Sequence, residues 1–184
     1  MTYRPDISCR YMAQLSPTAR VLLAMIRNGR RTGYEIKQLV DVSTRFFWAA
    51  SYGQIYPELK KLEQAGLIKG EDDPTGGRQR RAYSLTATGD RALDEWLRSD
   101  DEPTYEMRDE GLLKLFFSNE LTPRERLALL RRIRARHEAI VERLKTVEDL
   151  AAAVGGGPHM TLQFGLGQHG WVVDWCKKLE AEIE

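Results

Sequence analysis

The chain has 184 residues, 42% of them hydrophobic and 30% charged, which is the composition of a globular protein and excludes disordered and membrane-spanning classes. No run approaches the roughly 18 apolar residues that a spanning helix needs, and the first residues contain no apolar signal core, so we expect a cytoplasmic protein with no membrane partner. The formal net charge is only +1, but residues 1–98 hold 16 Lys and Arg against 11 Asp and Glu, whereas the remainder holds 12 against 16. A basic part joined to an acidic part is typical of a phosphate-binding module attached to a different module.

Three short helices are predicted in the first third of the chain. The pair Ser16-Pro17 is typical of a helix start, because the serine can accept a hydrogen bond from an unpaired backbone N–H and proline fits the first helical position. Apolar residues at helical spacing then predict a helix that ends near Asn28, a second one over 33–42 and a third over 51–66. The third helix has one apolar stripe, formed by Ile55, Leu59 and Leu62.

The opposite face of the third predicted helix is polar. A helix that enters the major groove needs short or amide side chains near its N-terminus for base edges, and basic side chains that reach the phosphates. Ser51, Tyr52 and Gln54 meet the first requirement, and Lys60 and Lys61 meet the second. The alternative is an ordinary amphipathic helix whose polar face is solvated.

Two short strands, over 67–70 and 81–85, are predicted on either side of a turn that contains Pro74 and two glycines. The returning arm carries a basic cluster where a wing would lie along the sugar-phosphate backbone or reach into the minor groove. This cluster consists of Arg78, Arg80 and Arg81. Three short helices followed by a hairpin is the element order of a winged helix-turn-helix.

Four more helices are predicted after the hairpin. The first is capped by Thr86, and helices over 109–119 and 122–154 follow, the latter starting with a capping box at Thr122. The apolar residues of 122–154 recur nearly every seven positions, so this helix needs a partner helix. A glycine-rich break at 155–158 precedes the last helix, which runs to the C-terminus.

These elements predict a mainly α fold with a small β-hairpin wing. An acidic segment that contains Pro103 is the expected domain boundary. The expected organisation is an N-terminal arm (1–15), a winged helix-turn-helix DNA-binding domain (16–98), a linker (99–104) and a helical dimerisation domain (105–184).

Four aromatic side chains are candidates for the walls of an effector site, because flat rings offer a large contact area to a planar hydrophobic compound. The alternative is that they pack in the core of a dimer. They are Trp96, Phe116, Trp171 and Trp175.

Metal binding and catalysis have little support. His137, His169 and Cys176 are good ligand types, but His169 and Cys176 are seven residues apart and no pair lies at i, i+3 or i+4, so we predict no metal site and no cofactor. Cys9 and Cys176 have no paired spacing and should be reduced thiols. The sequence contains no phosphate-binding glycine loop before a helix, no nucleophile elbow and no His-Glu helical pair, so we expect a protein that is not an enzyme.

Four segments form a recognisable set of motifs: 33–36, 51–63, 66–68 and 81–86. Together they resemble the PadR family of transcriptional regulators. It extends over about residues 16–98, and the helical remainder resembles the subfamily related to virulence-gene regulators. The resemblance implies a homodimer, a winged helix that binds DNA, usually repression, and in some members a response to small aromatic or hydrophobic compounds. It places Tyr34, Tyr52, Tyr56 and Lys60 at helix-turn-helix positions and 76–78 at the wing tip.

We therefore predict a sequence-specific transcriptional repressor. Its expected partners are double-stranded operator DNA, a second copy of itself bound through the C-terminal helices, and a small aromatic or hydrophobic effector that releases the DNA. Two other classes stay open, a scaffold dimer that uses its winged helix for protein contacts and a metal-responsive regulator. The first would bind no DNA, and the second would bind one zinc per chain.

Overall fold

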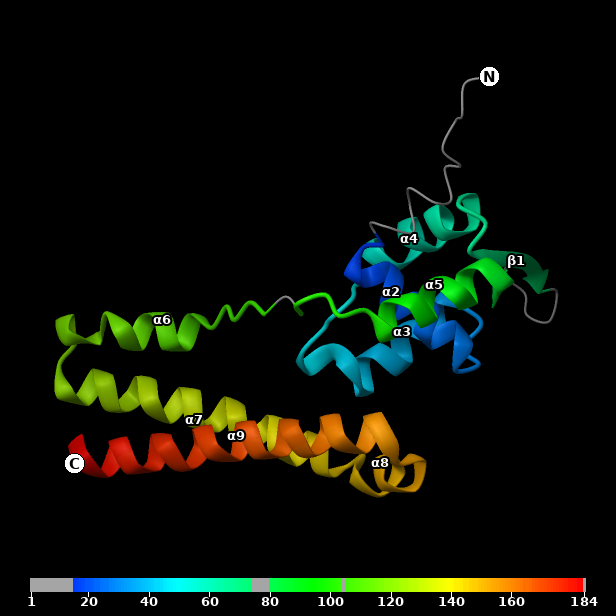
Figure 1. Cartoon of the computed structure of the whole chain (residues 1–184). Helices are drawn as coiled ribbons and strands as arrows, with labels where there is room; N and C mark the ends of the chain where they lie inside the picture. The colour runs from blue at the N-terminus through cyan, green and yellow to red at the C-terminus, as the bar shows by residue number, and fades with distance from the viewer. Residues whose placement is uncertain (1–14, 74–79, 104, 184) are drawn as a thin grey trace. The chain divides into compact units, whose positions relative to one another are not determined.

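The computed structural model describes residues 15–73, 80–103 and 105–183. They form helices and one two-stranded antiparallel sheet, so the predicted fold class, mainly α with a small hairpin, is confirmed (Figure 1). The chain divides into two compact units, Met1–Glu102 and Pro103–Glu184. None of the described helices is long and apolar enough to cross a membrane.

The N-terminal unit begins with the helix predicted from Ser16-Pro17. Ser16 caps it, because its hydroxyl accepts a hydrogen bond from the backbone N–H of Ala19 at 3.0 Å. Gly66, at φ +70°, follows the third helix in the left-handed conformation that glycine adopts without strain. The elements in order are α2 (Pro17–Arg27), α3 (Gly33–Val42), the 3₁₀ turn Thr44–Phe46, α4 (Tyr52–Gln64), β1 (Ile68–Asp73), β2 (Arg80–Leu85) and α5 (Ala87–Arg98).

The hairpin is longer than the sequence predicted. Its register runs from Ile68 opposite Leu85 to Asp73 opposite Arg80, so three acidic residues assigned to the turn belong to β1. They extend the strand because Asp72 lies opposite Arg81 and pairs with it at 3.0 Å, and opposite charges across an antiparallel pair stabilise the sheet. The wing therefore contains an ion pair near its end.

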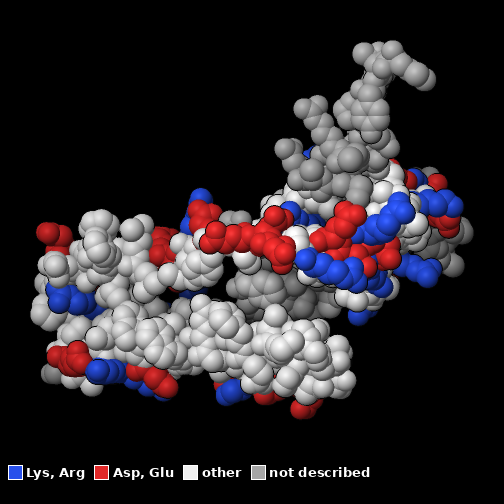
Figure 2. Space-filling model, in the orientation of Figure 1, with Lys and Arg blue, Asp and Glu red and all other residues white. Residues whose placement is uncertain are grey.

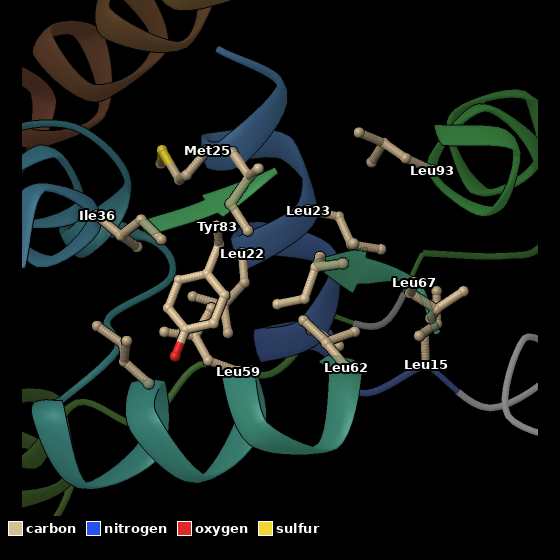
Figure 3. Close-up of a cluster of buried hydrophobic side chains, with 14 of the residues drawn as sticks. Leu15, Leu22, Leu23, Met25, Ile36, Leu59, Leu62, Leu67, Tyr83 and Leu93 are labelled. Carbon is tan, nitrogen blue, oxygen red and sulfur yellow. The ribbon is translucent and has the colours of Figure 1, made fainter. Parts of the chain in front are cut away.

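A single apolar core holds the N-terminal unit together, with α2 packed between α4, β2 and α5 (Figure 3). The three positions predicted as the apolar stripe of α4 are all fully buried, which confirms that prediction: Ile55, Leu59 and Leu62. Because its inner side is anchored in this way, α4 exposes its opposite side.

The C-terminal unit is an antiparallel pair of long helices with smaller ones attached (Figure 1). Its elements are α6 (Glu110–Phe116), the 3₁₀ turn Ser118–Glu120, α7 (Pro123–Lys145), α8 (Glu148–Val154) and α9 (Gly156–Ile183). The partner helix required by the seven-residue repeat of α7 is α9 of the same chain. Leu130 and Ile133 of α7 are buried in a cluster with Cys176 of α9, whose thiol is free.

The prediction of one helix over 122–154 was wrong, because the chain breaks at Thr146. The Thr146 hydroxyl donates to the carbonyl of Arg143 at 2.7 Å, and the N–H of Val147 bonds to Leu144 rather than one residue earlier. Two adjacent β-branched residues weaken a helix at this point, and the hydroxyl competes for its carbonyl groups. The break allows α8 to pack against α9.

Two histidines meet inside the helix pair. His137 of α7 is buried, and its Nδ1 lies 2.8 Å from Nδ1 of His169 on α9, so one ring donates and the other accepts. Burial lowers the pKa of both imidazoles, and the positive charges of His137 and Arg136 lower that of His169 further. The pair is stable only while at least one ring is neutral.

We expect the C-terminal unit to lose stability as the pH falls below 6.5, the ordinary histidine value. Because the folded pKa values are lowered, the unfolded chain binds protons more readily, so this stability is present above 6.5 and is lost as the pH falls through the folded values. Urea unfolding from about pH 8 to about pH 5 measures the effect. The double variant His137→Gln, His169→Gln keeps a polar pair that does not titrate and should show a flatter profile; equal profiles would contradict the assignment.

Candidate nucleic-acid interface

The exposed side of α4 carries every side chain that the sequence proposed for it. All six are exposed, and they follow one another from the N-cap to the last third of the helix. They are Ser51, Tyr52, Gln54, Tyr56, Lys60 and Lys61. On the preceding helix α3, Tyr34 is also exposed, and its hydroxyl accepts a hydrogen bond from Gln38 at 2.9 Å.

The two tyrosines of α4 are held against α3. The rings of Tyr52 and Tyr56 stack with centroids 6.1 Å apart, and the Lys37 ammonium lies 5.5 Å from the Tyr52 centroid. A Cβ on Gly33 would lie 2.7 Å from Cε1 of Tyr56, so a larger residue at this position would require the Tyr56 ring to shift. The rings are therefore positioned by both helices.

Gln54 also caps the start of α4, a role that was not predicted from the sequence. Its amide oxygen accepts from the backbone N–H of Ser51 at 2.9 Å and from the Ser51 hydroxyl at 3.0 Å. This arrangement is a capping box, and the spacing Ser-x-x-Gln could have predicted it. Recognition of adenine by both amide atoms would require Gln54 to release this cap.

The two lysines of α4 differ in their surroundings. Lys61 donates to Glu58 at 3.1 Å, and this buried carboxylate also accepts from the Ser16 hydroxyl at 2.6 Å. Lys60 forms no ion pair with any residue that the structure describes. Lys60 is thus available to an external anion without losing a partner, whereas Lys61 has to exchange one.

The wing is tied to α4 by charge. The Arg81 guanidinium donates to Glu63 at 3.3 Å and to Asp72 at 3.0 Å, and Glu63 also accepts from the backbone N–H of Gly70. The hydrogen bonds from Arg81 lower the pKa of the Glu63 carboxyl group, so it stays ionised. Of the other two arginines predicted for the wing, Arg78 lies outside the described residues, and Arg80 is described only as a backbone position in β2.

One face of the N-terminal unit is not suited to an anion. On the face drawn in Figure 2, basic and acidic side chains alternate over α5. Arg27 of α2 pairs with Asp90 and Asp94 of α5, each at 2.8 Å, and Asp94 also pairs with Arg98. These cations are neutralised locally, in contrast to Lys60.

The four aromatic candidates for an effector site belong to different units. Trp96 lies on α5, where the Arg20 guanidinium is 5.5 Å from its ring. The other three belong to the C-terminal unit, where Phe116 packs edge-on against Phe117 and the rings of Trp171 and Trp175 stack 6.0 Å apart. Within that unit, Phe116 lies on α6 and the two tryptophans on α9.

The helices, hairpin and exposed α4 define a winged helix-turn-helix protein of the class found among transcriptional regulators. Residues 22–95 match the transcriptional regulator PadR-like family, and residues 107–184 match the virulence activator alpha C-terminal family. The chain belongs to the PadR family, as its motifs predicted.

Proteins of known function match this chain over almost its whole length. The negative transcriptional regulator PadR of Bacillus subtilis is 27% identical over 173 residues, which are 89% of this chain and 95% of that protein. Its crystal structure with operator DNA has a TM-score of 0.81 at 26% identity and covers 90% of this chain and 97% of its own. Its crystal structure with p-coumaric acid has a TM-score of 0.72 at 26% identity, and the match covers 91% of this chain and 97% of that chain.

Proposed function

We propose that this protein is a sequence-specific transcriptional repressor that binds double-stranded operator DNA as a homodimer. The observation that carries the proposal is α4, a helix whose apolar side is fully buried and whose polar side is exposed. The proposal is supported by the likeness, over nine-tenths of the chain, to a regulator whose crystal structure contains operator DNA. Such a protein acts in the cytoplasm, and residues 16–98 and 105–184 would be its DNA-binding and dimerisation domains.

Within this proposal the residues have distinct roles. Tyr52 and Gln54 contact base edges near the N-terminus of α4, next to Tyr34, Ser51 and Tyr56. Lys60 attracts phosphates first, because it has no partner to lose among the described residues. The cations that join it on the DNA are Lys61, Arg78, Arg80 and Arg81.

Dimerisation is proposed through α9. Met160, Phe164 and Trp171 are each about two-thirds exposed, and their spacing places them on one side of the helix. Leu162, Val173 and Cys176 are buried on the opposite side, which packs in the unit's own core. The surface over the first half of α9 is nearly free of charged side chains (Figure 2). An apolar stripe of this kind is typical of a face that a second copy covers.

We also propose that a small aromatic or hydrophobic effector releases the DNA. A relative binds p-coumaric acid in its crystal structure. The candidate aromatic contacts for the effector are Trp96 in the N-terminal unit and, in the C-terminal unit, Phe116, Trp171 and Trp175. A compound that quenches tryptophan fluorescence and also weakens DNA binding would support this part of the proposal, and quenching without a change in affinity would contradict it.

The experiment that tests the DNA-binding proposal is selection of bound fragments from genomic DNA by the purified protein. We expect enrichment of a two-fold symmetric site whose halves are about one helical turn apart. Affinity for the site should fall steeply as the salt concentration rises, because each phosphate contact releases a counterion. A protein that retains no fragment at low salt would contradict the proposal.

Two substitutions on α4 are expected to separate specificity from affinity. Gln54→Ala should reduce the ratio of operator to random-DNA affinity by about tenfold, whereas Lys60→Ala should weaken both alike and lower the salt slope by about one. Titrations by fluorescence anisotropy on both DNAs measure these changes. Gln64→Ala, an exposed glutamine at the other end of α4, is the matched control. Equal losses on both DNAs for Gln54→Ala would remove Gln54 from the base-contacting residues.

A further inference from the structure

A cavity of about 220 Å³ lies between the start of α6 and one side of α7. This volume equals about seven water molecules at roughly 30 Å³ each, so it suits a compound with a single ring or a short chain. The α7 residues that line it lie on one helical face: Leu129, Arg132, Ile133, Arg136 and His137. None of the four aromatic effector candidates is among its lining residues.

The floor of the cavity is apolar. Leu129 and Ile133 are 4% and 7% exposed. Nδ1 of the buried His137 is already bonded to His169. Such a floor binds hydrocarbon surface rather than a hydrated inorganic ion.

The lining of the cavity holds three cations, Lys114, Arg132 and Arg136, against the two carboxylates of Asp109 and Glu110. Arg132 and Arg136 are one helical turn apart, and neither forms an ion pair with any described residue. Like charges at this spacing repel, and an anion between them would remove that repulsion. Of the other charged lining groups, Lys114 and Glu110 pair with each other at 2.7 Å, and the Asp109 carboxylate accepts from the N–H of Leu112 at 3.0 Å. The negative charge of Asp109 offsets part of the charge of the two arginines, and the lining keeps an excess of one positive charge.

We propose that this cavity binds a small organic carboxylate. Its carboxylate lies between the guanidinium groups of Arg132 and Arg136, which donate charge-assisted hydrogen bonds. Its apolar body covers Leu129 and Ile133. This site is distinct from the aromatic contacts proposed above for the effector. Only a regulatory role for it would rest on the proposed function, and the binding itself does not.

Calorimetric titration of the full chain tests the site with three probes: p-coumarate, benzoate and hexanoate. We expect at least one to bind, and the matching methyl ester, which keeps the apolar body without the charge, to bind at least about tenfold more weakly. The double variant Arg132→Gln, Arg136→Gln should lose about tenfold or more in carboxylate affinity. Arg124→Gln with Lys177→Gln removes the same charge outside the cavity and should leave the affinity unchanged.

Three outcomes would overturn the site: no heat of binding with any probe up to about 10 mM, equal affinity for acid and ester, or an unchanged affinity in the arginine variant. Thermal unfolding shows that each variant is folded before titration. The titration uses no DNA, so it stands apart from the proposed function. Carboxylate binding by a protein that retains no DNA would support the site and contradict the proposed repressor function. DNA binding without carboxylate binding would contradict the site and leave the repressor function supported.

Discussion

Replacement of Gly89 by alanine is expected to destabilise the N-terminal unit by about 3 kcal/mol. A Cβ at this position would lie 1.9 Å from the carbonyl oxygen of Leu67 and 2.8 Å from its carbonyl carbon. Both are backbone atoms, and they have little freedom to move, because the same oxygen accepts from the Thr86 N–H and hydroxyl at 3.1 Å. The side chain of Leu67 is fully buried, which fixes the residue further.

The steric clash outweighs the gain in helix propensity that alanine brings. Alanine favours a helix over glycine by about 1 kcal/mol, whereas relief of the contact requires α5 to separate from the start of β1. A small unit of marginal stability can lose its folded state through a change of this size. Urea unfolding followed by circular dichroism measures the loss. The matched control is Gly53→Ala in α4, where the nearest atom would be 3.8 Å away and we expect unchanged or higher stability. Equal stability of the two variants would show that the helix can shift without loss.

The close contact at Gly89 could not have been predicted from the sequence, although other features of the fold could. Helix starts were predictable, since Ser16-Pro17 and the capping box at Thr122 are local patterns. The buried side of α4 followed from spacing alone. That α5 crosses the backbone of Leu67 so closely is a contact between residues 22 positions apart, and no local pattern specifies it.

The candidate interface, too, could be predicted only in part. That its side chains are exposed follows from the periodicity of α4, but the partners of the wing arginine do not. Lys61 and Arg81 were predicted to contact phosphates, and in the structure each is paired with a carboxylate. Glu58 lies one turn from Leu62 on the apolar side, so its burial was visible in the spacing, although its hydrogen bond from Ser16 joins residues 42 positions apart. The pairing of Arg81 with Glu63 and Asp72 is thus set by long-range contacts, whereas that of Lys61 with Glu58 lies within one turn of α4 and could have been predicted.

The double substitution Phe164→Glu, Trp171→Glu is expected to abolish the proposed dimer and with it operator binding. The two side chains are 66% and 65% exposed in the single chain, so a second copy can bury them. Burial of a large aromatic side chain contributes about 2 kcal/mol, and a carboxylate in the same place would carry an uncompensated charge into the interface. Gly167 lies between them with no atom within 4 Å of its Cβ position, which leaves room for close approach of another helix.

Loss of the dimer has a large effect on DNA binding because each half-site alone has few contacts. A monomer must bind the halves separately, and the gain in effective concentration from the linked second site disappears, a factor of about 10² to 10⁴. Sedimentation velocity measures the oligomeric state, and anisotropy measures operator affinity. The control Ala135→Glu, Ala139→Glu adds the same charge at exposed positions of α7 without removing an aromatic side chain. If the α9 variant sediments as the wild type does and retains operator affinity, the exposed side of α9 is not where two copies meet, and its apolar stripe requires another partner.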